Sequence, residues 1–98
     1  MKLYTVAAAA CIVNSALAGN LLGYASRDCI GSLACRMNAI PCCGTLAEVC
    51  DQTVRSWDAE DHNINLYKQD KSYFGTVHHI LDCLDDPLGE VWYACAIC

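Results

Sequence analysis

The chain has 98 residues, with eleven acidic and six basic side chains and a formal net charge of −5. An acidic chain without a basic cluster is a poor candidate for binding nucleic acid or anionic membrane surfaces. A chain this short forms one domain at most. Secreted domains of this size bury too little surface to be comfortably stable and commonly depend on disulfides.

The first residues have the layout of a secretory signal peptide. Lys2 supplies a short positive region, residues 3–13 are apolar and uncharged, and a small-x-small pattern ends at Ala18. This pattern predicts a signal peptide at 1–18, cleaved after Ala18, and a single cysteine-rich domain at 19–98. The apolar run is about half the length that spans a bilayer. A secreted, extracellular protein without a membrane span is therefore expected.

Two short helices are predicted next along the chain. The first covers residues 32–40, where three apolar side chains fall on one helical face before Pro41. The second begins at Thr45, which forms a capping box with Glu48, and carries an apolar stripe to Trp57.

The second half of the mature chain predicts a loop, a helix and a strand. Residues 58–71 are polar and read as a long loop, with a strand at 63–67. Ser72 can cap a third helix that runs to about Asp86, where Pro87 ends it, and residues 91–98 have strand composition. The predicted fold class is α+β: a small disulfide-rich domain with two or three short helices packed on a small antiparallel sheet.

Removal of the signal peptide takes Cys11 away and leaves eight cysteines. An even number in an oxidising compartment indicates four disulfides, and the spacing fits neither a zinc site nor a thioredoxin-like redox motif. A bridge between adjacent Cys42 and Cys43 would be strained. In a strand at 91–98, Cys95 and Cys98 face opposite sides and should reach different partners; the pairing otherwise stays open. The predicted disulfide residues are Cys29, Cys35, Cys42, Cys43, Cys50, Cys83, Cys95 and Cys98.

A group of aromatic and basic residues is the candidate partner-binding site. Tyr67, Lys68 and Lys71 stand together in the polar segment of a mostly acidic chain, and such residues are common binding anchors. Their replacement by alanine is expected to weaken activity and leave folding intact. Tyr73 follows them in the same group, and the alternative interpretation is that Tyr73 packs in the core and both lysines are solvated.

A second candidate site is a divalent-cation site on the third predicted helix. At helical spacing, His78, His79 and Asp82 could converge on one ion. The alternative is a solvated acidic face in which a histidine screens the aspartates, and no cofactor is expected. No nucleophile motif accompanies these residues, so catalysis is not expected either.

The segment from Cys29 to Cys35 reads Cys-x-Gly-Ser-x-x-Cys and resembles the opening of the fungal killer toxin family first known from smut viruses. This resemblance implies a secreted α/β sandwich tied by disulfides, and the founding member blocks calcium channels in competing cells. The Cys42-Cys43 pair and the gap from Cys50 to Cys83 depart from the founding pattern, so no functional residue is carried over.

A second resemblance concerns the hydrophobins, which are secreted fungal surfactants with eight cysteines. Cys35, Cys42-Cys43 and Cys50 are similar to the first half of the hydrophobin pattern. The second half departs from it, because Cys95 and Cys98 are separated where an adjacent pair is expected.

The sequence thus predicts a secreted, disulfide-stapled protein of the fungal effector or toxin kind. We expect it to bind an extracellular or membrane-exposed protein target without catalysis, and to bind no nucleic acid. Two alternatives remain: a hydrophobin-like surface-active or wall-associated protein, and a secreted protein that binds a divalent cation.

Overall fold

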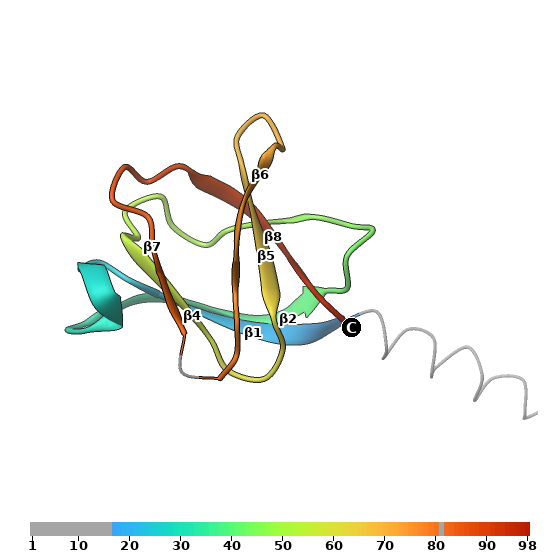
Figure 1. Cartoon of the computed structure of the whole chain (residues 1–98), viewed down its shortest axis with the longest axis horizontal. Helices are drawn as coiled ribbons and strands as arrows, with labels where there is room; N and C mark the ends of the chain where they lie inside the picture. Colours follow the sequence, from blue (N-terminus) through green and yellow to red (C-terminus); the bar gives the residue numbers. More distant parts are fainter. Residues whose placement is uncertain (1–16, 81) are drawn as a thin grey trace, which may run out of the picture.

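The computed structural model describes residues 17–80 and 82–98 (Figure 1). The predicted signal peptide therefore lies outside the described residues except for its last two positions, which belong to the first strand. Cys11 lies outside them as well.

The described residues form eight β-strands and one short 3₁₀ turn. The strands are β1 (Leu17–Tyr24), β2 (Leu33–Pro41), β3 (Ala47–Glu48), β4 (Ser56–Ala59), β5 (Ile64–Lys68), β6 (Tyr73–Val77), β7 (Cys83–Asp85) and β8 (Val91–Ala96), and the turn is η1 (Arg27–Cys29).

The strands form two antiparallel sheets that pack face to face (Figure 1). One sheet has the order β2-β1-β4-β7 and the other β3-β8-β5-β6. In the second sheet, Ile64 pairs with Ala96 at one end of β5, and Lys68 pairs with Val91 at the other. The turn between β5 and β6 therefore lies at the end of the sheet where β8 begins.

The core lies between the two sheets and combines side chains from both. Trp57 of β4 is its largest member and is almost completely buried. Burial of a large apolar side chain contributes about 1.5–3 kcal/mol. Partners from the facing sheet include Ile64, Leu66, Val77 and Ala94. Alternation along β5 directs Ile64 and Leu66 inward and directs Asn65 and Tyr67 to the opposite face.

The predicted α+β fold is wrong, because all three predicted helices are replaced by strands and turns. The segment 32–40 is β2, whose pairing with β1 is irregular and whose Ala39 has φ +59°. These irregularities break the apolar alternation that would have indicated a strand. The segment 72–86 contains β6 and β7, and β6 is rich in the aromatic and β-branched residues that favour strands.

The second predicted helix fails because its backbone bonds to a distant strand. Residues 45–57 hold only the two-residue β3 and the start of β4. The Val49 N–H donates to the Trp92 carbonyl at 2.9 Å, and the Cys43 N–H donates to the Ala96 carbonyl at 2.8 Å. Long-range pairing with β8 thus replaces the local bonds that the capping box would have started. The predicted strands at 63–67 and 91–98 correspond to β5 and β8.

Four disulfides join the eight cysteines: Cys29–Cys83, Cys35–Cys50, Cys42–Cys98 and Cys43–Cys95. Cys42 and Cys43 have different partners, and so do Cys95 and Cys98. The expectation of different partners for Cys95 and Cys98 is confirmed, and both bridges tie the segment 42–43 to the end of the chain at β8. Four bridges in so small a domain are consistent with an extracellular protein.

Candidate binding surface

The predicted binding residues lie in and beside the turn that joins β5 to β6. The Lys68 N–H donates to the Ser72 carbonyl and the Lys71 N–H to the Lys68 carbonyl, each at 2.8 Å. Asp70 Oδ1 accepts the Ser72 hydroxyl at 2.6 Å and the Ser72 N–H at 3.0 Å. The side-chain bond from Ser72, followed by the backbone bond, lowers the pKa of Asp70. The segment 58–71, which the sequence predicts as a long loop with a strand at 63–67, contains the end of β4, the strand β5 and this tight turn.

Lys71 occupies a backbone position that disfavours a side chain. Its φ is +70°, the left-handed region in which a hairpin bulge normally places glycine. Its Nζ lies 5.4 Å from the centroid of the Tyr93 ring, within the range of a cation–π contact. The strained residue thus sets a positive charge over an aromatic ring on the neighbouring strand.

Three tyrosines form a row across the solvent-facing side of the sheet. Tyr73 on β6 pairs with Tyr67 on β5, and Tyr67 pairs with Tyr93 on β8. We call these three residues the tyrosine row. The rings of Tyr67 and Tyr73 meet edge to face at 6.0 Å, a favourable aromatic geometry. Tyr73 is 58% exposed, so the row ends in an accessible ring.

Side-chain hydrogen bonds hold the tyrosine row along the sheet. The Tyr73 hydroxyl bonds to Thr76 Oγ1, and Thr76 in turn donates to Asn65 Oδ1 at 2.6 Å. The Tyr67 hydroxyl lies 3.8 Å from Cys95 Sγ; because the disulfide sulfur carries no hydrogen, the hydroxyl is the donor. These contacts restrain the side chains of Tyr67 and Tyr73 on the sheet.

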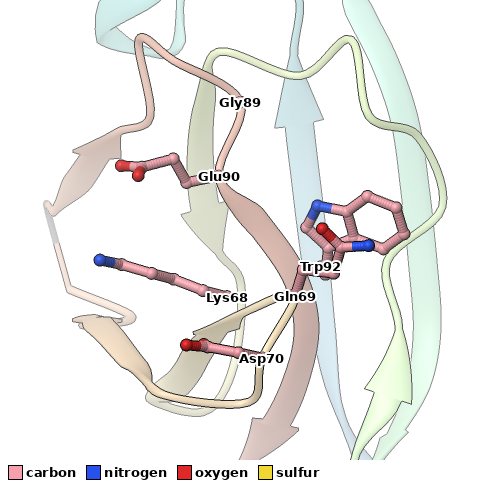
Figure 2. A pocket seen from close by; sticks show the side chains of 6 residues that line it. All are labelled: Lys68, Gln69, Asp70, Gly89, Glu90 and Trp92. Atoms are coloured by element: carbon pink, nitrogen blue, oxygen red, sulfur yellow. The ribbon is translucent and has the colours of Figure 1, made fainter.

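An open cleft of about 490 Å³ adjoins the row at the same end of the sheet. Its lining residues are Lys68, Gln69, Asp70, Gly89, Glu90 and Trp92. Figure 2 shows the side chains of Lys68, Asp70 and Glu90 extending in the same direction, with the Trp92 indole on the other side of the ribbon.

The turn that forms the far wall of the cleft is built on Asp86. This carboxylate is 1% exposed and accepts the Glu90 N–H at 2.7 Å and the Val91 N–H at 3.0 Å. Gly89 has φ +66°, and a Cβ there would lie 2.7 Å from an Arg55 guanidinium nitrogen. The left-handed conformation therefore favours glycine at this position, and a larger residue would also have to displace the end of the Arg55 side chain.

Two of the three predicted binding residues lie together in the structure, and the third lies apart from them. Tyr67 belongs to the tyrosine row and Lys71 lies over it, whereas Lys68 lines the cleft. Sequence reasoning missed Tyr93 and Trp92. Alternation gave no signal for Tyr93, because Val91 and Ala94 both face the core although they are three residues apart, and a bulge interrupts the alternation of β8.

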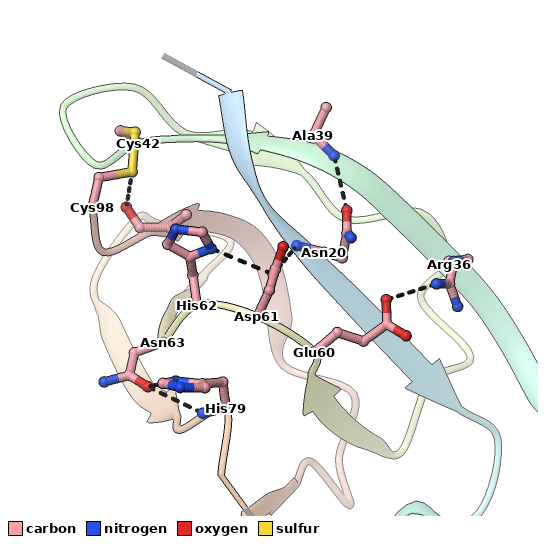
Figure 3. A network of polar contacts seen from close by, with 11 residues as sticks. Asn20, Arg36, Ala39, Cys42, Glu60, Asp61, His62, Asn63, His79 and Cys98 are labelled. Atoms are coloured by element: carbon pink, nitrogen blue, oxygen red, sulfur yellow. Dashed lines mark hydrogen bonds and ion pairs between the residues drawn. A yellow bond between two sulfur atoms is a disulfide. The ribbon is translucent and has the colours of Figure 1, made fainter. Parts of the chain in front are cut away.

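The predicted cation-site residues do not converge. His78 Nδ1 lies 2.9 Å from Asp82 Oδ2, and this side-chain hydrogen bond is the main cause of the lowered pKa of Asp82. His79 instead contacts Asn63, with Nδ1 at 3.0 Å from Oδ1 (Figure 3). Within residues 17–80 and 82–98, no group of three His, Cys, Asp or Glu side chains is placed to hold a metal ion.

A further set of polar contacts near His79 joins the first sheet to the turn before β5 (Figure 3). The Asn20 N–H donates to Asp61 Oδ1 at 3.0 Å, and Arg36 pairs with Glu60 at 2.6 Å. Because Arg36 and Glu60 are largely solvated, this pair contributes only about 0–1 kcal/mol. These contacts hold the strands and the turn in position. The tyrosine row is therefore the better candidate for a binding surface.

Comparisons with family models, curated proteins and solved structures find no match for this chain. Among the described residues, no helix has the length and apolar character needed to cross a membrane.

Proposed function

We propose that this protein is a secreted effector or toxin-like protein that binds an extracellular or membrane-exposed target without catalysis, through the tyrosine row and Lys71. The observation that carries the proposal is the row itself: three aromatic side chains on adjacent strands, facing solvent and ending in a ring that is 58% exposed. Tyrosine provides a large, rigid contact area at low entropic cost and is enriched at binding hot spots.

The strain at Lys71 supports the same surface. A non-glycine residue in the left-handed region costs about 1–2 kcal/mol, so a glycine there would favour folding. Lysine at this position instead provides a charged group above Tyr93. A side chain retained against its backbone preference is typical of functional sites.

Binding of the fluorescently labelled, disulfide-bonded protein to intact fungal, plant and bacterial cells tests the proposal. We expect saturable binding to one of these surfaces. The Tyr73→Ala variant should bind about tenfold more weakly, corresponding to about 1.4 kcal/mol. Lys71→Gly should also weaken binding while the free energy of unfolding stays equal or rises, since the left-handed strain is removed.

The matched control is Tyr24→Ala, which removes a half-buried tyrosine from the end of β1 in the other sheet. This variant should bind as the parent protein does. Equal binding by the parent, Tyr73→Ala and Lys71→Gly would contradict the proposed surface.

A further inference from the structure

The cleft beside the tyrosine row contains polar groups that have no partner in the protein. Among the described residues, the side chains of Gln69 and Glu90 make no hydrogen bond or ion pair, Lys68 interacts only through its charge with the Asp70 carboxylate, and the indole N–H of Trp92 donates to none of them. Asp70 uses only Oδ1 for Ser72. Lys68, Asp70 and Glu90 thus border the open cleft on one side of the ribbon and Trp92 borders it on the other (Figure 2), and these groups retain hydrogen-bonding capacity for a ligand.

The chemistry of these groups favours a neutral polyhydroxyl ligand. The cleft combines one ammonium (Lys68), one amide (Gln69) and two carboxylates (Asp70 and Glu90), so neither an anion nor a cation would find a site of uniform charge. A hydroxyl group both donates and accepts, and it can satisfy each of these side chains. The negative face of the Trp92 ring attracts the weakly positive C–H groups of a sugar ring.

The cleft continues directly into the tyrosine row. The pairing of β5 with β8 shifts between Tyr67 and Lys68: Tyr67 pairs with Tyr93, Lys68 pairs with Val91, and Trp92 between them is the extra residue. The irregularity is a β-bulge, which re-aims side chains locally. The aromatic surface therefore runs from the cleft across adjacent strands to Tyr73 and suits an extended chain of repeating rings better than a compact molecule.

We propose that the target of this surface is a neutral polysaccharide chain, with one sugar stacked on Trp92 in the cleft and the following sugars along the tyrosine row. The inference rests on the proposed function, because it names the chemical class of the target for the same surface.

Sedimentation with insoluble chitin, cellulose and β-1,3-glucan tests the inference directly. We expect the disulfide-bonded protein to be retained on at least one of these polymers. Trp92→Ala should weaken retention about tenfold, and Trp92→Phe should restore most of it because the ring is kept. The double variant Gln69→Ala/Glu90→Ala, at two exposed positions without internal contacts, should weaken retention with unchanged folding.

Two control variants match these substitutions on the other side of the molecule: Tyr24→Ala, and Glu60→Ala, which removes an exposed acidic residue following β4. Both should be retained as the parent is. Absence of retention on all three polymers, or equal retention of Trp92→Ala and the Gln69/Glu90 variant with the parent, would overturn the polysaccharide assignment.

Digestion of the target cells separates this inference from the proposed function. Cells are treated with protease, or with chitinase, cellulase and β-1,3-glucanase, and washed before the labelled protein is added. Loss of binding only after the glycanases supports a polysaccharide target. Loss only after protease assigns a protein target, which overturns the inference and leaves the proposed function standing. If no cell surface binds the parent protein, both fail.

Discussion

The two ends of the sheet β3-β8-β5-β6 are held by different means. At the end where β8 finishes, Cys42–Cys98 and Cys43–Cys95 tie the sheet to a distant segment. At the end where β8 begins, hydrogen bonds to Asp70 and Asp86 shape the turns, and no disulfide joins them among the described residues.

The two kinds of bond have different effects on the protein. A disulfide stabilises mainly by restricting the unfolded chain, whatever the surrounding side chains are. A hydrogen bond to a turn sets the local path of the backbone and depends on the identity of the side chain. The cleft and the tight turn lie at the hydrogen-bonded end, so single substitutions there should alter the surface more than the loss of a distant bridge.

The largest expected effect is on the disulfides, and it should be non-additive. Cys29–Cys83 closes a long segment alone, and its replacement by two alanines should lower the free energy of unfolding by roughly 4 kcal/mol. Replacing only Cys42–Cys98 leaves Cys43–Cys95 holding nearly the same loop, so the loss should be roughly 2 kcal/mol or less. Removal of both parallel bridges should exceed the sum of the two single losses. Guanidinium unfolding measures each value.

Equal losses for Cys29–Cys83 and for either parallel bridge would contradict this redundancy. Additive losses for the two parallel bridges would contradict it as well. The test is independent of any ligand, because it compares variants of the free protein only.

The sequence predicted the disulfide-bonded end of this sheet better than the hydrogen-bonded end. Residue counts and compartment indicated four bridges, and Cys95 and Cys98 have different partners as predicted, although β8 ends at Ala96 and Cys98 lies beyond the strand. The actual pairing depended on the parallel course of residues 42–43 beside Ala96, which no local pattern shows.

The local sequence could not exclude the three predicted helices, because their apolar residues do occur at helical spacing. In the structure these residues belong to irregular strands. Leu33 is exposed, while Ile40 is buried against the facing sheet. Strand irregularities at Ala39 and around Tyr67 shift the alternation by one residue and imitate a helical period. The cleft lies beside a second irregularity, between Tyr67 and Lys68 in the pairing of β5 with β8, the two strands that the sequence did predict.

A smaller loss is expected from Asp86 at the hydrogen-bonded end. Asp86→Ala removes the acceptor for the Glu90 and Val91 N–H groups, and an unsatisfied buried group costs about 1–3 kcal/mol. Asp86→Asn should cost less, since one amide oxygen can still accept. Denaturant unfolding measures the loss, and amide hydrogen exchange at residues 90 and 91 should rise. Unchanged exchange in Asp86→Ala would show that the carboxylate does not shape this turn.

The smallest effect concerns the titration of Asp70 in the turn between β5 and β6. Bonds from the Ser72 hydroxyl and N–H hold the pKa of this carboxyl below its ordinary value of 3.8. Because the folded-state pKa is lowered, the stabilising contribution is complete above that ordinary value and is lost as the pH falls through the folded-state pKa. Ser72→Ala should raise the pKa of Asp70 toward 3.8 and move the acid-induced loss of the turn to higher pH.

Carboxyl chemical shifts measured by NMR across this pH range report the change. Asp51 is the internal control, because its pKa is lowered by its own bonds from Thr53. A shift of both aspartates in Ser72→Ala, or of neither, would contradict a turn organised locally by Ser72.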